Sequence, residues 1–318
     1  MVTGAAGFIG SHIADRLLDM GWNVLGLDNL SGGDVANLTH AMKSSRFRFV
    51  EGDLLELAAI ERAIKDYELV FHLAADPEVR VGAQNPDLHF KQNLLATFNL
   101  LEALRKRGAS TKMVFASTST IYGEPSIIPT PEDYGPLLPI SVYGATKLGC
   151  EALAASYMQL LPLRLAIFRF ANVVGNRAKH GVIYDFIMKL RKDPHELEVL
   201  GDGTQTKSYL HIDDCTDAFL KVLDDTFWQN PVEIYNIGSE DQIDVLRIAQ
   251  IVTNAMGLDN VSIRTTRGSD GRAWPGDVKT MLLDIAKIKK RGWEPKLNSQ
   301  EAVTLAAESL VRELSMNK

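Results

Sequence analysis

The sequence predicts an α/β fold with a doubly wound parallel sheet and a smaller C-terminal lobe. In the first half of the chain, short apolar runs alternate with amphipathic stretches. The runs are continuously apolar, which is typical of strands buried on both faces of a sheet. Strands that alternate with helices pair in parallel through right-handed crossovers. The second half is less regular, which indicates a separate lobe built around a different set of elements.

The elements of the first half follow from this pattern in order. The first helix is expected at Ile9–Met20, because its apolar residues recur at helical spacing on one face. The other expected helices are Leu54–Lys65, Leu88–Lys106 and Val142–Leu161. The expected strands are Val24–Asp28, Phe47–Asp53, Leu69–Ala75, Lys112–Thr118 and Arg164–Phe170.

The second half contains fewer clear elements. Helical spacing predicts helices at Val182–Lys192, Val245–Met256 and Glu301–Leu314, and apolar runs predict strands at Glu198–Gly201, Tyr209–Ile212 and Glu233–Ile237. Pro and Gly gather at 123–139 and 268–276, which predicts long surface loops. We expect residues 1–171 and about 209–238 to form the first lobe, and about 172–208 and 239–318 to form the second.

The composition excludes several classes of protein. The net charge is −6 and no stretch concentrates Lys and Arg, so a nucleic-acid partner is not expected. No apolar run approaches the roughly 20 residues that span a bilayer, and no secretion signal is visible. The cysteines Cys150 and Cys215 predict buried thiols in a reducing cytoplasm. The 7 histidines show no metal-ligand spacing, so no metal is expected.

The stretch "VTGAAGFIGSH" places Gly4, Gly7 and Gly10 between a strand and a helix. Such a loop lets backbone N–H groups approach a pyrophosphate at the helix N-terminus, as in Rossmann-like folds. Asp28 ends the next strand, where a carboxylate accepts bonds from ribose hydroxyls and repels a 2′-phosphate. The sequence therefore predicts NAD as cofactor. Only Met1–Thr3 precede the loop, so either the first strand is minimal or the native chain extends further.

The stretch "SVYGATK" holds Tyr143 and Lys147 four residues apart, on one face of the expected helix. A nearby ammonium favours the phenolate, so we expect Lys147 to lower the pKa of Tyr143. Tyr143 is then a candidate general base that removes a hydroxyl proton while a hydride leaves the same carbon. Upstream, "FASTST" places Ser117 and Thr118 at the carboxyl end of a strand, where ligands of open α/β sheets bind.

Together these motifs resemble the extended short-chain dehydrogenase/reductase family, and within it the nucleotide-sugar epimerases of the UDP-galactose (UDP-glucose) 4-epimerase type. The resemblance runs from Val2 to about Leu310. It rests on GxxGxxG, Asp28, "LAA" at 73–75, Asn93, "STS", YxxxK, "RFANVVG", "GDGTQTKSYLHIDD" and "NIGS".

The resemblance implies a role for each matching residue. Tyr143 would be the base, Lys147 would also hold the nicotinamide ribose, and Thr118 would bond the sugar O4. The cofactor-binding residues would be Gly4, Gly7, Phe8, Ile9, Gly10, Asp28, Asn29, Asp53, Leu54, Leu73, Ala74, Ala75, Asn93, Ser117, Tyr143, Lys147 and Phe170. The substrate-binding residues would be Thr118, Tyr143, Asn172, Val182, Val199, Lys207 and Arg272. The first lobe would bind NAD and the second the nucleotide sugar.

The implied activity is the interconversion of UDP-glucose and UDP-galactose through a 4-keto sugar, in galactose metabolism. UDP-glucuronate or a UDP-N-acetylhexosamine as substrate, a reductase and a non-catalytic NAD-sensing protein remain alternatives. A 4,6-dehydratase would carry an Asp-Glu pair after Thr118, where this chain has Ser119 and Thr120. The resemblance also implies a homodimer that pairs the helices at 88–106 and 142–161.

Three positions depart from the pattern of the family. Thr118 stands where many relatives have serine, and Lys207 stands where the usual residue is arginine. Arg272 lies two residues earlier than the common spacing before Gly-Asp. Met281 falls where relatives tune the room beside the hexose, and it leaves the choice of sugar open.

Overall fold

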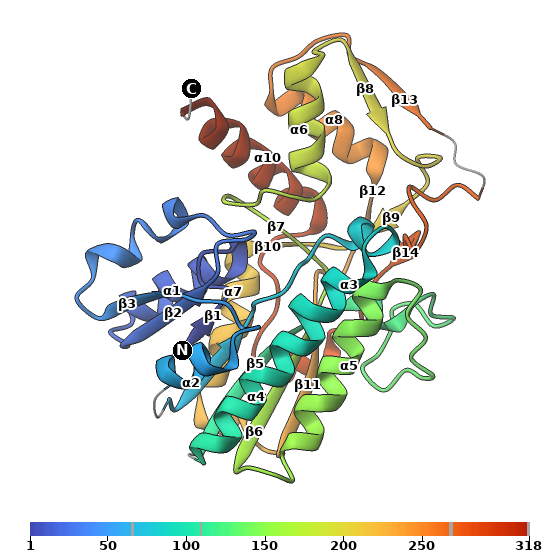
Figure 1. Cartoon of the computed structure of the whole chain (residues 1–318). Coiled ribbons are helices and arrows are strands. Elements are labelled where there is room, and N and C mark those ends of the chain that lie inside the picture. Colours follow the sequence, from blue (N-terminus) through green and yellow to red (C-terminus); the bar gives the residue numbers. More distant parts are fainter. Residues whose placement is uncertain (65–66, 109, 267–269, 317–318) are drawn as a thin grey trace. The chain divides into compact units, whose positions relative to one another are not determined.

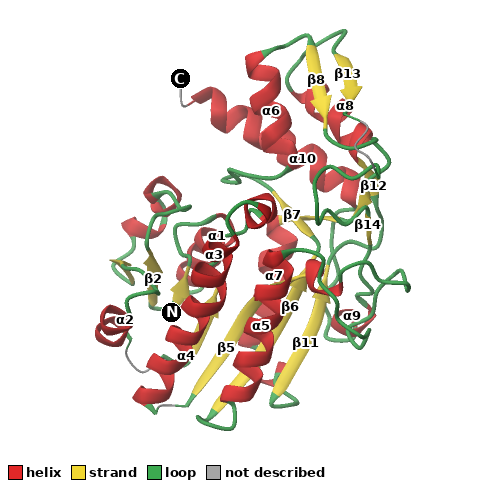
Figure 2. Ribbon diagram, turned by 45° about the vertical axis from the view of Figure 1, so that its right-hand side comes forward, coloured by secondary structure: helices red, strands yellow, loops and turns green. Residues whose placement is uncertain are grey.

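The computed structural model describes residues 1–64, 67–108, 110–266 and 270–316. Within these residues, seven strands form one sheet in the order β11-β6-β5-β4-β1-β2-β3 (Figures 1 and 2). The pairs β1–β2, β1–β4, β2–β3 and β4–β5 are parallel. The strands are β1 (Val2–Thr3), β2 (Val24–Asp28), β3 (Phe47–Glu51), β4 (Leu69–His72), β5 (Thr111–Thr118), β6 (Leu163–Phe170) and β11 (Val232–Ile237). The predicted fold class is confirmed.

Helices cover both faces of this sheet. Val70 and Phe71 are successive residues of β4, so they point to opposite faces. Val70 belongs to an apolar core with residues of α2, α4 and α5, whereas the Phe71 ring meets Phe219 of α7 edge-on at 6.1 Å. The helices are α1 (Phe8–Asp19), α2 (Leu57–Ala63), α3 (Pro86–His89), α4 (Ala96–Arg107), α5 (Val142–Tyr157) and α7 (Ile212–Leu220).

Some predicted elements differ from the observed ones. The helix expected at 88–106 is divided into α3, a π-helical segment (η4, Phe90–Leu95) and α4. The helix expected at 54–65 is observed as the shorter α2, because Asp53 turns the chain by accepting a hydrogen bond from the Leu55 amide at 2.8 Å. Residue 65, the expected end of that helix, lies outside the described residues. The strand expected at 198–201 is observed two residues earlier, since Gly201 turns the chain with φ +87°.

The second half of the chain adds small sheets and further helices. The strands are β7 (Asn172–Val174), β8 (Glu196–Val199), β9 (Thr206–Lys207), β10 (Tyr209–His211), β12 (Ile243–Asp244), β13 (Ser262–Thr265) and β14 (Thr280–Met281). The helices are α6 (Val182–Lys192), α8 (Val245–Ala255), α9 (Ala286–Lys289) and α10 (Ser299–Met316). Single-turn 3₁₀ helices occur at Val35–Leu38, Ala41–Lys43, Val79–Ala83, Ser119–Tyr122, Lys221–Leu223 and Asp225–Phe227.

The chain forms two compact units. The first comprises Met1–Ile121, Val142–Arg169 and Phe219–Tyr235, and the second comprises Tyr122–Ser141, Phe170–Ala218 and Asn236–Lys318. The expected lobe boundaries differ from these at 122–141 and 209–218, and by a few residues at 170–171 and 236–238. The loop at 122–141 belongs to the second unit because Tyr122 bonds Asn236 at 2.7 Å and Thr130 pairs with Leu283. Strand β10 belongs there because it pairs with β7.

Three further expectations concern the cysteines, membrane-spanning helices and the loop at 268–276. Cys150 and Cys215 are free and buried, as predicted. Among the described helices, none has both the length and the apolar composition to cross a membrane. The loop expected at 268–276 starts outside the described residues; its part from residue 270 contains no helix or strand.

Candidate active site

The glycine loop of the first unit forms a narrow cradle at the N-terminus of α1. Gly4 has φ +68°, and a Cβ atom on it would lie 2.8 Å from the amide nitrogen of Ala74. A Cβ atom on Gly10 would overlap the carbonyl oxygen of Gly4. Gly7 is the N-cap residue of α1 without a side-chain cap, and the first turn holds no acidic residue. Since Phe8 and Ile9 begin this helix, its N–H groups fit the pyrophosphate of a dinucleotide.

Asp28 closes the other side of this loop. One of its carboxylate oxygens accepts from the Ala6 amide at 2.9 Å, and the other accepts from the Leu30 amide at 2.8 Å. Burial raises the pKa of Asp28, and these backbone bonds oppose the rise. The amides of Ala6, Gly7 and Leu30 bond this carboxylate, which has about four acceptor sites, so one remains for a ribose hydroxyl. Asn29 donates to Asp53 at 3.0 Å, which joins two residues expected beside the adenosine. These groups fit NAD.

The remaining loop residues cluster at the carboxyl ends of β1 and β4. The amides of Leu73 and Ala74 donate to the Thr3 hydroxyl at 3.2 and 3.3 Å. Ala75 follows in the same loop, and Leu54 is buried after β3. Asn93 in η4 is 1% exposed and accepts a bond from the Asp76 amide at 2.8 Å. The strand order reverses between β1 and β4, which is where ligands bind in open α/β sheets.

Tyr143 and Thr118 lie together, and Lys147 follows Tyr143 by one turn of the same helix. Tyr143 and Lys147 are four residues apart in α5, and Thr118 ends β5. The Tyr143 phenol and the Thr118 hydroxyl share a hydrogen bond. The Thr120 amide donates to the Thr118 oxygen at 3.2 Å and fixes that hydroxyl. Lys147 is 3% exposed, and its ammonium lies 4.2 Å from the centre of the Phe115 ring.

The pKa of Tyr143 was predicted to be lowered, and this direction is wrong for the protein without bound cofactor. Burial raises the pKa of Tyr143 to about 12, and the hydrogen bond with Thr118 opposes the rise only partly. Burial also lowers the pKa of Lys147 to about 8. Both shifts have the same cause, since each group loses water that would stabilise its charged form. Ionisation of Tyr143 near neutral pH therefore depends on further charges or donors around the phenol.

Ser117 has a role that the sequence did not predict. Its hydroxyl donates to the carboxylate of Glu151, which lies one turn beyond Lys147 in α5. Arg169 of β6 donates to the same carboxylate at 2.8 and 3.1 Å. All three residues are at most 5% exposed. The side chain of Ser117 thus belongs to a buried network beneath the site, although its place at the end of β5 is the expected one.

In the second unit, Lys207 and Arg272 both meet Asp277. Lys207 in β9 bonds the Asp277 carboxylate at 2.6 Å, and its ammonium lies 5.7 Å from the centre of the Trp274 ring. Arg272 donates to the Asp277 carbonyl oxygen at 2.7 Å and to the carboxylates of Asp270 and Glu124 at 2.8 and 2.5 Å. Two cations expected at a diphosphate are therefore linked through one acidic residue.

The other predicted residues of this unit are more dispersed. Asn172 begins β7, and its side-chain amide donates at 3.2 Å to the carbonyl oxygen of Ser208, the residue after Lys207. Val199 ends β8 and is fully buried, and Val182 is the first residue of α6. Phe170 ends β6 and is 6% exposed.

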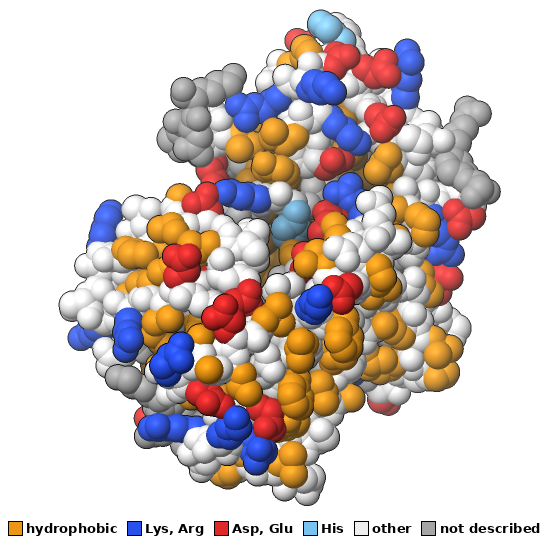
Figure 3. All heavy atoms as spheres, viewed as in Figure 1, with side chains coloured by type: hydrophobic (Ala, Val, Ile, Leu, Met, Phe, Trp, Pro, Cys, Tyr) orange, Lys and Arg blue, Asp and Glu red, His pale blue; other side chains and the backbone are white. Residues whose placement is uncertain are grey.

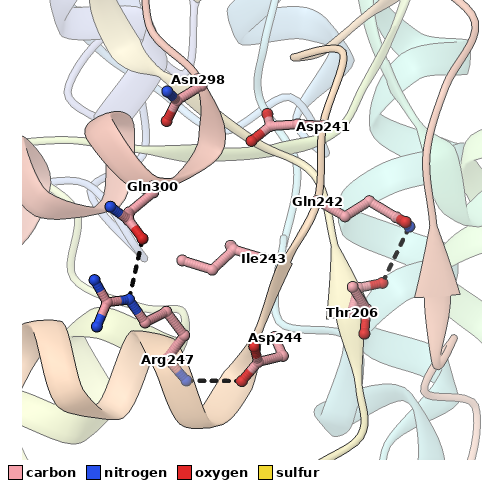
Figure 4. A pocket seen from close by; sticks show the side chains of 8 residues that line it. All are labelled: Thr206, Asp241, Gln242, Ile243, Asp244, Arg247, Asn298 and Gln300. Atoms are coloured by element: carbon pink, nitrogen blue, oxygen red, sulfur yellow. Dashed lines mark hydrogen bonds between the residues drawn. The ribbon is translucent and has the colours of Figure 1, made fainter.

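A hollow of about 600 Å³ lies elsewhere in the second unit (Figure 4). Its polar side chains are bonded to their neighbours: Asp244 caps α8 by accepting from the Arg247 amide at 2.8 Å, and Arg247 donates to Gln300 at 3.0 Å. The lining residues are Thr206, Asp241, Gln242, Ile243, Asp244, Arg247, Asn298 and Gln300. Predicted site residues do not line this hollow, and we assign no role to it.

Sequence reasoning missed several residues around these sites. Asp76 and His89 flank Tyr143, and Asp277 holds Lys207. Asp277 is the last residue of the "RAWPGD" stretch that contains Arg272, and Glu151 follows Lys147 by one helical turn. Both residues could have been found from their spacing in the sequence. No such signal exists for His89, because the break between α3 and η4 is not visible in the sequence.

The fold and the first unit's site define an α/β enzyme that uses a dinucleotide. The chain belongs to the NAD dependent epimerase/dehydratase family, whose model matches residues 1–238. It is an NAD-dependent isomerase of the UDP-sugar 4-epimerase type. The resemblance seen in the sequence is thereby confirmed, and so is the predicted cofactor.

Three relatives illustrate the similarity. The chain is 31% identical to UDP-glucose 4-epimerase of Mycolicibacterium smegmatis over 319 residues, which cover 97% of each protein. A solved UDP-galactose 4-epimerase is 43% identical, with a TM-score of 0.87 and 98% of both chains covered. UDP-glucuronic acid 4-epimerase of Bacillus cereus, solved with UDP-glucuronic acid and NAD, is 29% identical, with a TM-score of 0.87 and the same coverage.

Proposed function

We propose that the chain interconverts UDP-glucose and UDP-galactose through a 4-keto sugar. The observation that carries the proposal is the group formed by Tyr143, Thr118 and Lys147, with a phenol bonded to a hydroxyl and a lysine one turn along the same helix. When bound, NAD⁺ would supply the hydride acceptor, and then the hydride donor, for carbon 4 of the sugar. A reaction of this kind has no net redox change, so the protein should keep its cofactor between turnovers.

Tyr143 is proposed as the general base. It takes the proton of the sugar O4 hydroxyl as the carbon–oxygen bond becomes a carbonyl, and it returns that proton when the sugar is reduced again. Thr118 would accept or donate a hydrogen bond at the same O4, and the Thr120 amide keeps its oxygen in place. Lys147 would hold the nicotinamide ribose. Because the Lys147 side chain is buried, its ammonium stays at the site and does not extend into solvent.

The residues after Thr118 favour epimerisation over dehydration. A 4,6-elimination needs an acid and a base beside the hexose C5 and C6. Here the 3₁₀ turn that follows β5 begins with Ser119 and Thr120, and the Thr120 hydroxyl lies 3.1 Å from that of Thr118. Hydroxyl groups with ordinary acidity do not supply either function. A reductase is the second alternative, and it would depend on added NADH and a second substrate.

Lys207 and Arg272 are proposed to bind the diphosphate of the nucleotide sugar. Asp277 orients the Lys207 ammonium, which keeps further donor positions for phosphate oxygens. Arg272 uses its guanidinium on Asp270, Glu124 and a backbone carbonyl, so two of its five N–H groups remain. Binding energy at the diphosphate lets the sugar itself be held loosely enough to rotate after oxidation.

The choice of sugar is tested by comparing rates. We expect UDP-glucose and UDP-galactose to react faster than UDP-glucuronate, because the sequence offers no obvious cation for a C6 carboxylate. Met281 pairs with Lys207 in the small sheet and is 8% exposed, and its flexible side chain leaves the N-acetylated sugars as a comparison to make. Rates are measured by NMR under identical conditions for UDP-glucose, UDP-galactose, UDP-glucuronate and the N-acetylated UDP-sugars. A clear preference for UDP-glucuronate would replace the substrate proposed here.

We further propose that the protein is a cytoplasmic homodimer that serves galactose metabolism. Hydrophobic side chains gather over α4 and α5 in the space-filling view (Figure 3), and Phe90 and Phe98 of this region are 52% and 39% exposed. Two free buried thiols suit a reducing compartment. Sedimentation of the wild type and of Phe98→Glu tests the dimer: the variant should dissociate, and a wild type that sediments as a monomer would contradict it.

A further inference from the structure

His89 is a buried imidazole beside Tyr143 that has no part in the chemistry described so far. It is 0% exposed, and its ring lies edge-on to the Tyr143 ring, with centroids 5.7 Å apart and an interplanar angle of 65°. It is the last residue of α3, immediately before the π-helical segment η4. π-helical turns inside helices often occur at functional sites, where they redirect a side chain.

The contacts of His89 fix which nitrogen carries hydrogen. Nε2 lies 3.2 Å from the carbonyl oxygen of Glu78 and 3.5 Å from the carboxylate of Asp76. Both neighbours are acceptors, so Nε2 must be the donor. Nδ1 has no hydrogen-bond partner among the described residues, and it faces Gly82, where a Cβ atom would lie 2.6 Å away. Glycine at 82 therefore provides the room that the ring occupies.

Asp76 links His89 to the phenol of Tyr143 electrostatically. Burial is the main reason that the pKa of Tyr143 is raised, and the negative charge of Asp76 adds to it. The titratable and polar groups near Tyr143 are Thr118 from β5, Cys150 from its own helix, Asp76 from the loop after β4, and His89. Lys147 lies one turn further along the same helix. The charged groups around His89 are Asp76 and the pairs Glu78–Arg80 and Asp87–Lys91.

We propose that His89 is a positioning residue for Tyr143: its Nε2–H group, which donates to the Glu78 carbonyl oxygen, lies 3.5 Å from the Asp76 carboxylate, and its ring edge contacts the phenol ring. The assignment rests on the proposed role of Tyr143 as base. The positive end of this N–H group lies beside the Asp76 carboxylate, so the imidazole reduces the negative potential at the phenol. Tyr143 can then ionise at lower pH than it could beside a carboxylate without this donor.

Two substitutions separate the donor from the ring. His89→Gln keeps an N–H group near the position of Nε2 and loses the ring, whereas His89→Phe keeps a ring against Tyr143 and loses the donor. We expect His89→Phe to move the acidic limb of the kcat–pH profile up by about half to one unit, which is about a three- to tenfold loss of kcat on that limb. KM for the UDP-sugar should stay within about twofold, and His89→Gln should keep the wild-type profile.

The reverse pattern, a shifted profile for His89→Gln alone, would show that only packing matters and would overturn the proposal. Equal profiles for the two variants and the wild type would overturn it as well. If His89→Phe does not fold, Asp76→Asn takes its place, since it removes the charge and keeps the oxygen that accepts from the Glu78 amide at 3.0 Å. Asp76→Asn should move the limb to lower pH, and an unchanged or upward-shifted limb would contradict the assignment.

A measurement without substrate keeps this inference separate from the proposed function. Imidazole ¹⁵N spectra of the wild type at neutral pH should contain one ring with hydrogen on Nε2 and none on Nδ1, and His89→Gln should lose that signal. Hydrogen on Nδ1 of His89 would overturn the assignment even in an active epimerase. A protein that shows the expected spectrum but leaves every UDP-sugar unchanged would instead contradict the proposed function.

Discussion

The ammonium of Lys207 lies 2.6 Å from the Asp277 carboxylate, and the Asp277 side chain is only 2% exposed. A buried acid of this kind fixes the direction of the lysine, because a long side chain otherwise samples many rotamers. The pair leaves donor positions of Lys207 for a second anion. An arginine at this position would instead bind phosphate through two parallel hydrogen bonds from its planar guanidinium group.

Lys207→Ala should weaken substrate binding more than catalysis. A charge-assisted bond contributes about 1.5–3 kcal/mol, so KM for the UDP-sugar should rise about tenfold to a hundredfold while kcat changes little. Steady-state kinetics measure both. Lys279→Ala is the control, because Lys279 bonds Asp202 at 2.9 Å in the same unit and has no proposed substrate contact. Equal KM increases in the two variants would argue against a phosphate role for Lys207.

Gly4→Ala should abolish retention of NAD. The substitution forces φ +68° on an L residue and drives its Cβ against the Ala74 amide. Cofactor retained after purification is measured by absorbance and chromatography of the denatured supernatant. Gly108→Ala is the matched control, since Gly108 has φ +71° and open space around it. The control should lose some stability and keep the cofactor; loss of cofactor from both variants would contradict the cradle.

Glu151→Gln should destabilise the first unit strongly. Removing the charge of Glu151 takes the neutralising carboxylate away from the buried Arg169 cation, which costs about 3–5 kcal/mol in comparable pairs. Urea unfolding followed by circular dichroism measures the free energy of unfolding. Lys91→Ala tests an exposed pair, whose side chains are 53% and 64% exposed, and should change stability by less than about 1 kcal/mol. A loss of similar size in both variants would show that the buried network contributes little.

Lys147 makes the stability of the cofactor-free protein depend on pH. Burial lowers the pKa of Lys147 to about 8 from the value of 10.5 that an exposed lysine has. Between these values the unfolded chain holds a proton that the folded chain has released, so stability rises with pH in this window. Relative to Lys147→Met, the wild type should gain about 1.4 kcal/mol per pH unit between pH 8 and 10.5. A constant difference across this range would show that Lys147 keeps its proton.

The sheet and the cofactor loop were largely predictable from the sequence. Continuous apolar runs identify the buried strands. Gly4, Gly10 and Asp28 identify the cofactor loop, because few other sites need glycines in a tight turn together with a carboxylate at the end of the next strand. Tyr143 and Lys147 were predictable for a similar reason, because helical spacing alone places them on one face. The edges of elements were less certain. Asp53 and Gly201 end or turn segments whose apolar pattern continues past them.

The electrostatics of the site could not be predicted in the same way. The direction of the Tyr143 pKa depends on how completely the phenol is buried, and sequence spacing carries no information on that. The contact between His89 and Tyr143 depends on a π-helical turn, and the ion pair between Glu151 and Arg169 joins a helix to a strand. Such contacts follow from tertiary packing, which short-range patterns do not encode.

The most direct test of Tyr143 as the base is an NMR assay with UDP-galactose and no added cofactor. Purified wild-type protein should form UDP-glucose with the NAD that it carries. Tyr143→Phe should keep the cofactor and lose about a hundredfold to ten-thousandfold in rate, because only the phenolic oxygen is removed. Conversion by Tyr143→Phe at the wild-type rate would contradict the account, and so would a wild type that leaves UDP-galactose unchanged even when NAD⁺ is supplied.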